Sequence, residues 1–187
     1  MHTARFVVPA LVACALAVSS PARADVSSWL YFGGGPSWLT TTERGTTTES
    51  SLQMETGLGT PPADAFAAGG LFRVHTHFSR GTDLALLARV ATHGFVNGGW
   101  GVGLDLGGYE RFWEQGSTGL LGSLVLGAPW GITLSATAGF GTNEQRIYAG
   151  TLGIDLARLT VYRRTGESWF KNPFPAYRPE ERGELRE

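Results

Sequence analysis

Residues 100–107 read Trp-Gly-Val-Gly-Leu-Asp-Leu-Gly and alternate without exception between large apolar side chains and small or charged ones. In an extended chain successive side chains point to opposite faces, so the four apolar residues share one face and Asp105 shares the other with the glycines. A period of two is typical of a β-strand with one apolar face. The preceding Asn97-Gly98-Gly99 is a turn signal. This stretch therefore predicts a strand that follows a tight connection.

The same alternation continues on both sides of this stretch. It is clear in residues 66–78, 83–93 and 132–140 and weaker in 52–58, 120–126 and 148–156, while Trp29 to Thr40 is apolar on both faces. Together with residues 100–107, these segments predict eight strands. No amphipathic stretch of helical length separates them, so we expect an antiparallel meander.

Strand-breaking residues mark the connections. A Thr-rich polar segment, Thr40 to Ser50, is expected to be the first loop. Ser79-Arg80-Gly81 is expected to be a three-residue hairpin loop with glycine in the left-handed conformation. That loop would place His77 opposite Asp83 and Arg73 opposite Leu87.

The composition fits one β-rich domain and excludes several functions. The chain has 187 residues, of which 27 are Gly, 17% are charged, and the net charge is −1. Glycine disfavours helices, and the lack of long apolar runs argues against a helical membrane bundle. The near-neutral charge argues against nucleic-acid binding, which needs a basic face.

The first residues read as an export signal. Residues 1–24 have a short basic start, an apolar stretch and a small-x-small cleavage pattern at Ala22-Arg23-Ala24. Leu11-Val12-Ala13-Cys14 offers another cut, which would leave a lipidated Cys14. We expect residues 1–24 to be a signal peptide, 25–164 a β-barrel domain, and 165–187 a Pro-containing charged tail.

Strand length points to a membrane. The longer segments approach the 9–11 or so residues that a tilted strand needs to cross a bilayer, and only closed barrels satisfy every backbone group in lipid. The sequence thus predicts an all-β fold, an eight-stranded antiparallel up-and-down transmembrane β-barrel. Its inward polar set would be Glu55, Arg73, His75, His77, Asp83, Arg89, His93, Asp105 and Asp155, with Tyr109 beside them. Its lipid-facing set would be Phe72, Val74, Leu84, Leu86, Val102, Leu104, Leu106, Ile132 and Leu134.

These features resemble small bacterial outer-membrane β-barrels of the OmpA-like and OmpX-like kind, from Asp25 to about Arg164. The resemblance rests on the signal, the eight alternating segments and aromatic residues near strand ends. These are Trp29, Trp38, Phe95, Trp100, Tyr109, Phe112, Trp113, Trp130, Phe140, Tyr148 and Tyr162. It implies the outer membrane of a Gram-negative cell. The charged tail departs from the terminal aromatic strand of such barrels and reads as a periplasmic extension or a flap over the barrel mouth.

Two constellations allow sharper hypotheses. His75, His77 and His93 with Asp83 could hold Zn²⁺, but lumen histidines paired with acids are favoured, so no metal and no cofactor is expected. His77-Phe78-Ser79 resembles the His-x-Ser element of lipid A deacylases, in which His is the base and Ser the nucleophile. In that family the element lies in a late strand and a Glu orients the His, whereas here it lies in the third strand.

The leading hypothesis is a non-enzymatic outer-membrane barrel with a structural, adhesion or small-solute role, whose partner is outer-membrane lipid. No protein partner can be named from the sequence. The alternatives are a lipid-modifying barrel enzyme and a soluble periplasmic barrel that binds an apolar ligand inside, as lipocalin-type barrels do. The direction of the apolar faces separates the soluble alternative from the two membrane hypotheses.

Overall fold

The computed structural model of the chain describes residues 25–41, 44–61, 65–114, 116–142, 144–159 and 170–171. Its long strands are β1 (Asp25–Thr41), β2 (Gly45–Gly59), β3 (Phe66–His77), β4 (Gly81–Thr92), β5 (Gly101–Arg111), β6 (Ser117–Gly127), β7 (Ile132–Gly141) and β8 (Arg146–Asp155). A short helix, α2 (His93–Val96), joins β4 to β5, and a 3-10 helix, η2 (Pro129–Gly131), joins β6 to β7. The expected signal peptide, and all of the expected tail except the two residues of β9 (Phe170–Lys171), lie outside the described residues.

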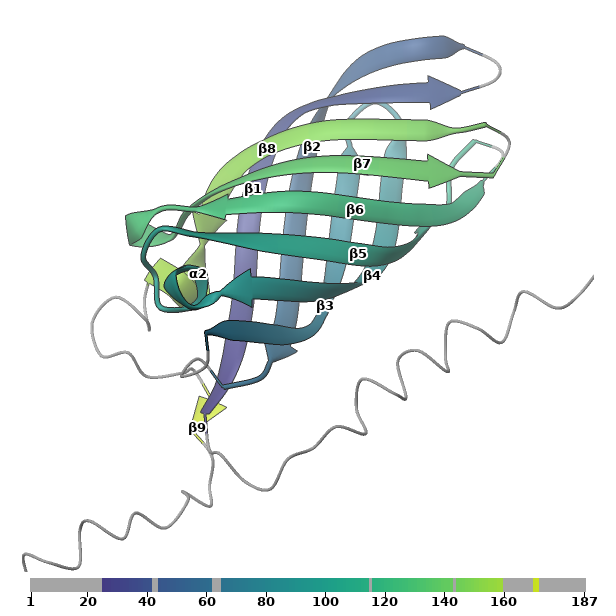
Figure 1. Cartoon of the computed structure of the whole chain (residues 1–187). Helices are drawn as coiled ribbons and strands as arrows, with labels where there is room; N and C mark the ends of the chain where they lie inside the picture. Colours follow the sequence, from purple (N-terminus) through teal and green to yellow (C-terminus); the bar gives the residue numbers. More distant parts are fainter. Residues whose placement is uncertain are drawn as a thin grey trace, which may run out of the picture.

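The eight long strands close into a barrel (Figure 1). Each strand pairs antiparallel with the next one in sequence, and β1 pairs with both β2 and β8. The strand β9 pairs with the first two residues of β1. The predicted eight-stranded antiparallel up-and-down barrel is therefore confirmed as a fold.

The register determines the shape of the barrel. A path that starts at Leu30 in β1 and steps from partner to partner through β2 to β8 returns to β1 at Thr40, ten residues further along. With eight strands, a rise of about 3.3 Å per residue and a spacing of about 4.8 Å, this shear gives a strand tilt of about 40°. The corresponding barrel radius is about 8 Å, which side chains can fill.

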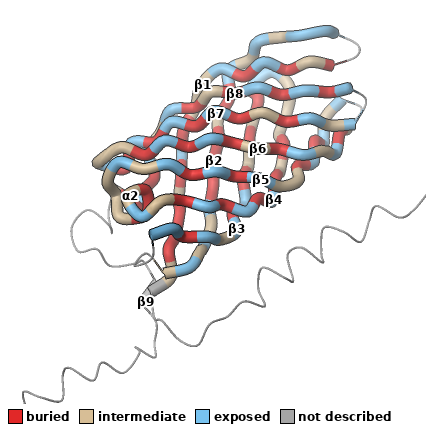
Figure 2. The backbone as a smooth tube through the Cα atoms, viewed as in Figure 1, coloured by how far each residue is buried: buried red, intermediate tan, exposed pale blue. Residues whose placement is uncertain are grey.

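Burial alternates along the barrel strands (Figure 2), except near the start of β1, where Ser27, Ser28 and Trp29 are all buried. In β5, for example, Gly103, Asp105 and Tyr109 are buried, whereas Leu104 and Leu106 are exposed. Two small groups of buried apolar residues lie inside, one around Trp29 and Phe95 and the other around Leu71 and Leu121. Polar and charged side chains fill much of the remaining interior.

The two ends of the barrel differ. The hairpin end carries the short connections that follow β1, β3, β5 and β7. The α2 end carries the connections that follow β2, β4 and β6, with Phe95 and Val96 of α2 fully buried. Because α2 packs there, its two apolar side chains close that end of the lumen.

The first hairpin is longer than the sequence suggested. Residues Thr40–Ser50 were expected to form a polar loop, but Thr40 and Thr41 belong to β1, and Gly45–Ser50 belong to β2. Threonine is β-branched and fits an extended, half-exposed backbone, so a polar Thr run can continue a strand.

The ladder between β1 and β8 is interrupted. Tyr31–Gly34 pair with Leu152–Asp155 and Ser37–Thr40 pair with Arg146–Ala149, but Gly35 and Pro36 have no partner in β8. Pro36 has no backbone N–H to donate. The other seven pairings of the barrel strands are continuous over their described length.

Candidate functional site

Two acidic and two basic residues meet near the middle of the lumen. Glu55 lies opposite Arg73 in the β2–β3 register, and Arg89 lies opposite Asp105 in the β4–β5 register. Each of these four side chains is at least 95% buried. Because all four belong to the inward face of their strands, the alternation alone brings them together. We call them the four-charge cluster.

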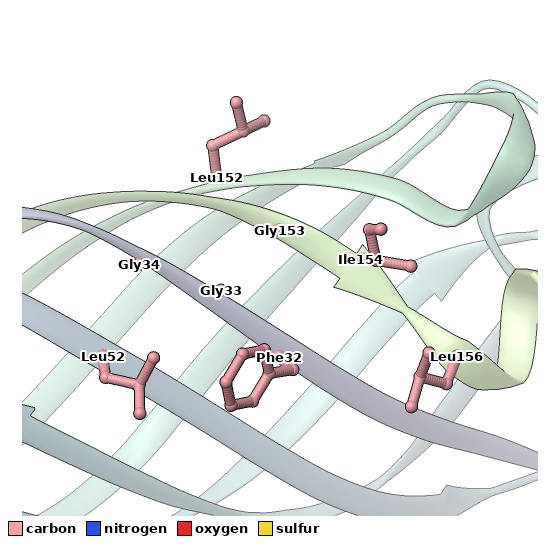
Figure 3. A pocket seen from close by; sticks show the side chains of 8 residues that line it. All are labelled: Phe32, Gly33, Gly34, Leu52, Leu152, Gly153, Ile154 and Leu156. Atoms are coloured by element: carbon pink, nitrogen blue, oxygen red, sulfur yellow. The ribbon is translucent and has the colours of Figure 1, made fainter.

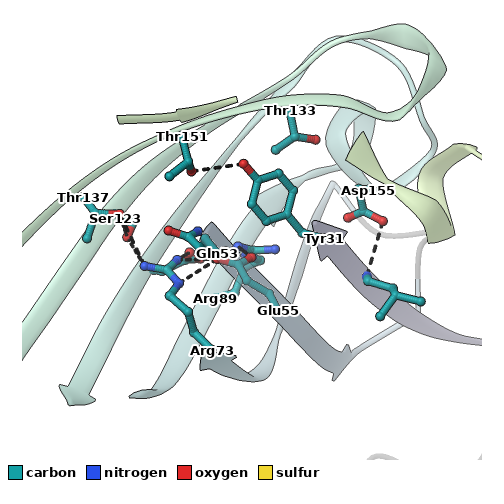
Figure 4. Close-up of polar contacts among 12 residues, drawn as sticks. Tyr31, Gln53, Glu55, Arg73, Arg89, Ser123, Thr133, Thr137, Thr151 and Asp155 are labelled. Atoms are coloured by element: carbon teal, nitrogen blue, oxygen red, sulfur yellow. Dashed lines mark hydrogen bonds and ion pairs between the residues drawn. The ribbon is translucent and has the colours of Figure 1, made fainter. Parts of the chain in front are cut away.

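The side chains of the four-charge cluster lie close together, and Figure 4 labels Glu55, Arg73 and Arg89 among them. Arg73 Nη2 lies 2.6 Å from Glu55 Oε1 and 2.7 Å from Asp105 Oδ2. Arg89 Nε lies 2.6 Å from Asp105 Oδ1, and its Nη2 lies 2.8 Å from Glu55 Oε2. Each carboxylate thus contacts both guanidinium groups, so the formal charges of the cluster cancel. Charge-assisted hydrogen bonds of this length are the strong kind.

Neutral polar residues extend this network across the lumen. Gln53 Nε2 donates to Glu55 Oε1 at 2.8 Å, and Arg73 Nη1 donates to Ser123 Oγ in β6 at 2.6 Å. Ser123 Oγ is in turn 2.8 Å from Thr137 Oγ1 in β7. The network therefore connects β2 through β7 across the lumen, as in small barrels whose interior is filled by side chains.

A second polar cluster lies at the hairpin end. Arg111 donates to both carboxylate oxygens of Asp83, from Nε at 3.0 Å and from Nη2 at 2.9 Å, and Trp113 Nε1 donates to Asp83 Oδ1 at 2.9 Å. His77 Nδ1 lies 2.9 Å from Ser37 Oγ, and His77 Nε2 lies 3.4 Å from Asp83 Oδ2. The second distance is too long for a good hydrogen bond.

His75 lies between the two clusters. Its ring centroid is 4.5 Å from that of His77, and it is 98% buried. Neither of its ring nitrogens has a hydrogen-bond partner among the described residues. Within the part of the chain that the structure describes, no group of three or more His, Cys, Asp and Glu residues is arranged to hold a metal ion.

The β3–β4 register differs from the sequence expectation by two residues. His77 lies opposite Gly81, His75 opposite Asp83, and Arg73 opposite Ala85. The reason is that the turn comprises residues 78–80, so Gly81 is the first residue of β4. Because the shift is even, every side chain keeps its expected face.

Eight of the nine residues expected in the lumen are buried inside the barrel, and His93 is not among them. It is exposed at the start of α2, where Asn97 contacts its ring. The expectation for His93 is wrong because β4 ends at Thr92, so the strand alternation does not reach residue 93.

Asp155 and Arg158 close the α2 end. Asp155 Oδ1 accepts hydrogen bonds from the backbone N–H groups of Leu30, at 3.3 Å, and of Arg158, at 3.1 Å. The Arg158 guanidinium donates to the carbonyl oxygens of Phe95 at 2.7 Å, Gly99 at 2.8 Å, Ala128 at 3.0 Å and Ile132 at 3.2 Å. One side chain thus holds the β4–β5 and β6–β7 connections together.

Ser79 does not lie with His77. It is exposed in the β3–β4 turn and bonds the Glu49 side chain, whereas the serine next to the His77 ring is Ser37 from β1. Ser37, His77 and Asp83 are each at least 98% buried, and Arg111 neutralises Asp83. All three side chains are therefore closed off from solvent, whereas a general base and its nucleophile have to be open to substrate.

The residues expected to face lipid all lie on the outer face of the barrel. Phe72, Leu86, Val102, Leu104, Leu106, Ile132 and Leu134 are exposed, and Val74 and Leu84 are half-buried. Several interior residues were missed by the sequence analysis, namely Tyr31, Ser37, Gln53, Arg111, Ser123, Thr137 and Arg158. Gln53, Ser123 and Thr137 lie on the inward face of segments that the alternation already predicted, and Arg111 could have been found by extending the alternation of residues 100–107. Arg158 lies beyond β8, in residues 156–159, and carried no such signal.

Fold and interior together define a closed eight-stranded barrel with an apolar outside and a charged, packed inside. No family model matches the chain, no curated protein matches it, and no solved structure matches it. None of the described helices is both long enough and apolar enough to span a membrane.

Proposed function

We propose that this protein is a non-enzymatic bacterial outer-membrane β-barrel with a structural or adhesion role. The observation that carries the proposal is the outer face. Among the barrel strands, the exposed charged side chains of the described residues are Glu110 and Arg146, both near the hairpin end. The remainder of the strand exterior is apolar side chains, glycine and alanine, with uncharged Ser and Thr residues such as Thr48, Ser50 and Thr118. A largely uncharged, apolar exterior is what lipid requires.

Exposed aromatic residues lie at both ends of this apolar surface. Phe66, Trp100 and Trp130 lie at the α2 end, and Trp38, Phe78, Phe112, Phe140 and Tyr148 lie at the hairpin end. Trp100 and Phe112 flank β5 and are twelve residues apart. At about 3.4 Å per residue and a tilt of about 40°, twelve residues rise about 31 Å along the axis. That distance suits an apolar band of about 25 Å with an aromatic girdle at each edge.

The interior supports a sealed barrel. The four-charge cluster and its neutral partners fill the lumen, so a role in structure or adhesion is favoured over passage of solutes. A soluble barrel that binds an apolar ligand needs the opposite arrangement, with apolar side chains inside. The export pattern in residues 1–24 supports the location.

The test is fractionation of cells that express the full chain. We expect the mature protein in outer membranes, resistant to carbonate extraction, with a different gel mobility in SDS before and after heating. Recovery in the soluble periplasmic fraction would refute the proposal. Release of fatty acid from lipopolysaccharide by the purified protein, abolished by Ser37→Ala or Ser79→Ala, would favour the enzyme instead.

A further inference from the structure

A groove follows the β1–β8 seam on the outside of the barrel (Figure 3). It has a volume of about 400 Å³, and its walls are the side chains of Phe32, Leu52, Leu152, Ile154 and Leu156. Its floor is the backbone of β1 and β8 at Gly33, Gly34 and Gly153. Gly34 is the one of the three on the outward face of its strand, so its missing side chain leaves the space between Leu52 and Leu152 open. The lining contains no charged residue.

The glycines of the floor are needed for close strand approach. A Cβ at Gly33 would overlap the Tyr31 ring, and a Cβ at Gly153 would overlap the Phe32 carbonyl. Inside the barrel, Tyr31 uses the space that Gly33 leaves and bonds Thr151 of β8 at 3.0 Å. These contacts keep β1 and β8 close together along the floor of the groove, next to Gly35 and Pro36, which have no partner in β8.

The length and direction of the groove match one leaflet of a bilayer. It runs from Leu156, near the α2 end, along four residues of β8 to Leu152. From there it crosses the strands, because Leu152 lies opposite Gly34 in β1 and Gly34 lies opposite Leu52 in β2. With the tilt derived above, the four residues along β8 and the two strand spacings from β8 to β2 together rise about 16 Å along the barrel axis. Half of the hydrocarbon core of a typical bilayer is about 15 Å.

We propose that the groove binds one acyl chain of a phospholipid from the leaflet at the α2 end, more tightly than the rest of the belt holds lipid. This inference rests on the proposed membrane location. A chain lying in a concave apolar groove gains dispersion contacts on two sides and on the floor, whereas a convex barrel wall offers one side.

A protein partner fits the groove less well. Eight residues line it, whereas a stable protein interface uses about 20–30 residues on each side. The lining also offers no polar side chain that would orient a peptide. The small, apolar, elongated shape therefore favours an acyl chain over a second copy of the barrel.

One substitution fills the groove, a second adds a side chain next to its upper end, and a third is a matched control. Gly34→Leu places a side chain on the floor, where a Cβ comes within 3.0 Å of the Ser51 carbonyl oxygen. Gly150→Leu adds one at the upper end of the seam, where nothing lies within 4 Å. Gly108→Leu adds the same side chain at nearly the same depth on β5, across the barrel, where the nearest atom is 3.8 Å away.

The experiment uses purified barrel in phosphatidylcholine vesicles that contain a phosphatidylcholine with a photoreactive diazirine on one acyl chain. After illumination, trypsin releases residues 147–158, which carry β8 and the groove, and residues 90–111, which carry β5. In the parent we expect label concentrated several-fold on the first peptide. Gly34→Leu and Gly150→Leu should lose most of that excess, and Gly108→Leu should keep it.

Even labelling of both peptides would overturn the inference while leaving the membrane location intact. So would an excess that survives in both groove variants, or a covalent dimer that shields the groove from label. Gly150→Leu keeps the test decisive if Gly34→Leu does not fold. A parent chain that takes up no label at all would mean that it does not enter the bilayer, which is a failure of the proposed function itself.

Discussion

The inside and the outside of this barrel are made by the same strands with opposite chemistry. On β5, Asp105 is completely buried in the four-charge cluster, while its neighbour Leu104 is 60% exposed on the outer face. In a soluble β-barrel these two side chains would exchange places, because there water covers the outside. Under the proposed membrane location, the comparison teaches that the surrounding solvent, and not the fold, decides which face of a strand is apolar.

The largest effect is expected from breaking the inside. Asp105→Ala removes the carboxylate that contacts both Arg73 and Arg89 and leaves two buried guanidinium groups with Glu55 alone. We expect a loss of about 3–5 kcal/mol in the free energy of unfolding, because one partner of a buried ion pair is left uncompensated. Guanidinium unfolding of the refolded barrel in detergent measures it.

The control combines four substitutions in one variant. These are Glu55→Leu, Asp105→Leu, Arg73→Met and Arg89→Met. Apolar residues of similar volume often equal or exceed a buried ion pair in stability. We therefore expect this variant to recover most of the loss. A fourfold variant less stable than Asp105→Ala would mean that the cluster itself drives folding.

A smaller effect is expected from breaking the outside. Leu104→Arg puts a charge near the middle of the apolar belt and should cost about 2–4 kcal/mol in bilayers. The matched control on the same strand is Glu110→Arg, at the hairpin end, where a charge is already present and should cost about 0–1 kcal/mol. Equal stabilities of the two variants in vesicles would contradict a lipid-facing belt.

The smallest effect concerns the hairpin-end cluster. Ser37→Ala removes the hydroxyl that lies 2.9 Å from His77 Nδ1. A single buried hydrogen bond contributes about 0.5–1.5 kcal/mol, so we expect a loss in that range. Ser50→Ala, at an exposed position on β2, should leave the unfolding midpoint unchanged. A loss of more than about 3 kcal/mol would instead give Ser37 a central role in the packing of the lumen.

The alternation of side chains made the barrel predictable, because it depends on single residues and needs no tertiary contact. It fixed the face of Leu104 and of Arg73 correctly even where the β3–β4 register was wrong by two. Register depends on where a turn begins, and Ser79-Arg80-Gly81 and residues 78–80 are equally plausible turns in sequence. His93 was misplaced because a strand can end one residue before its pattern does. Arg158 could not be found, since four of its partners are backbone carbonyls, which carry no sequence signal, and the other is the Thr133 hydroxyl.

The position of Arg158 in the sequence makes the α2 end of the barrel depend on the last part of the barrel chain. Its guanidinium joins connections made by residues 95–99 and 128–132, yet it comes after the last barrel strand. A chain cut short before residue 158 lacks the group that joins these two connections. Joining the two connections at the α2 end therefore requires the chain up to residue 158. A truncated chain differs from the full barrel at this end.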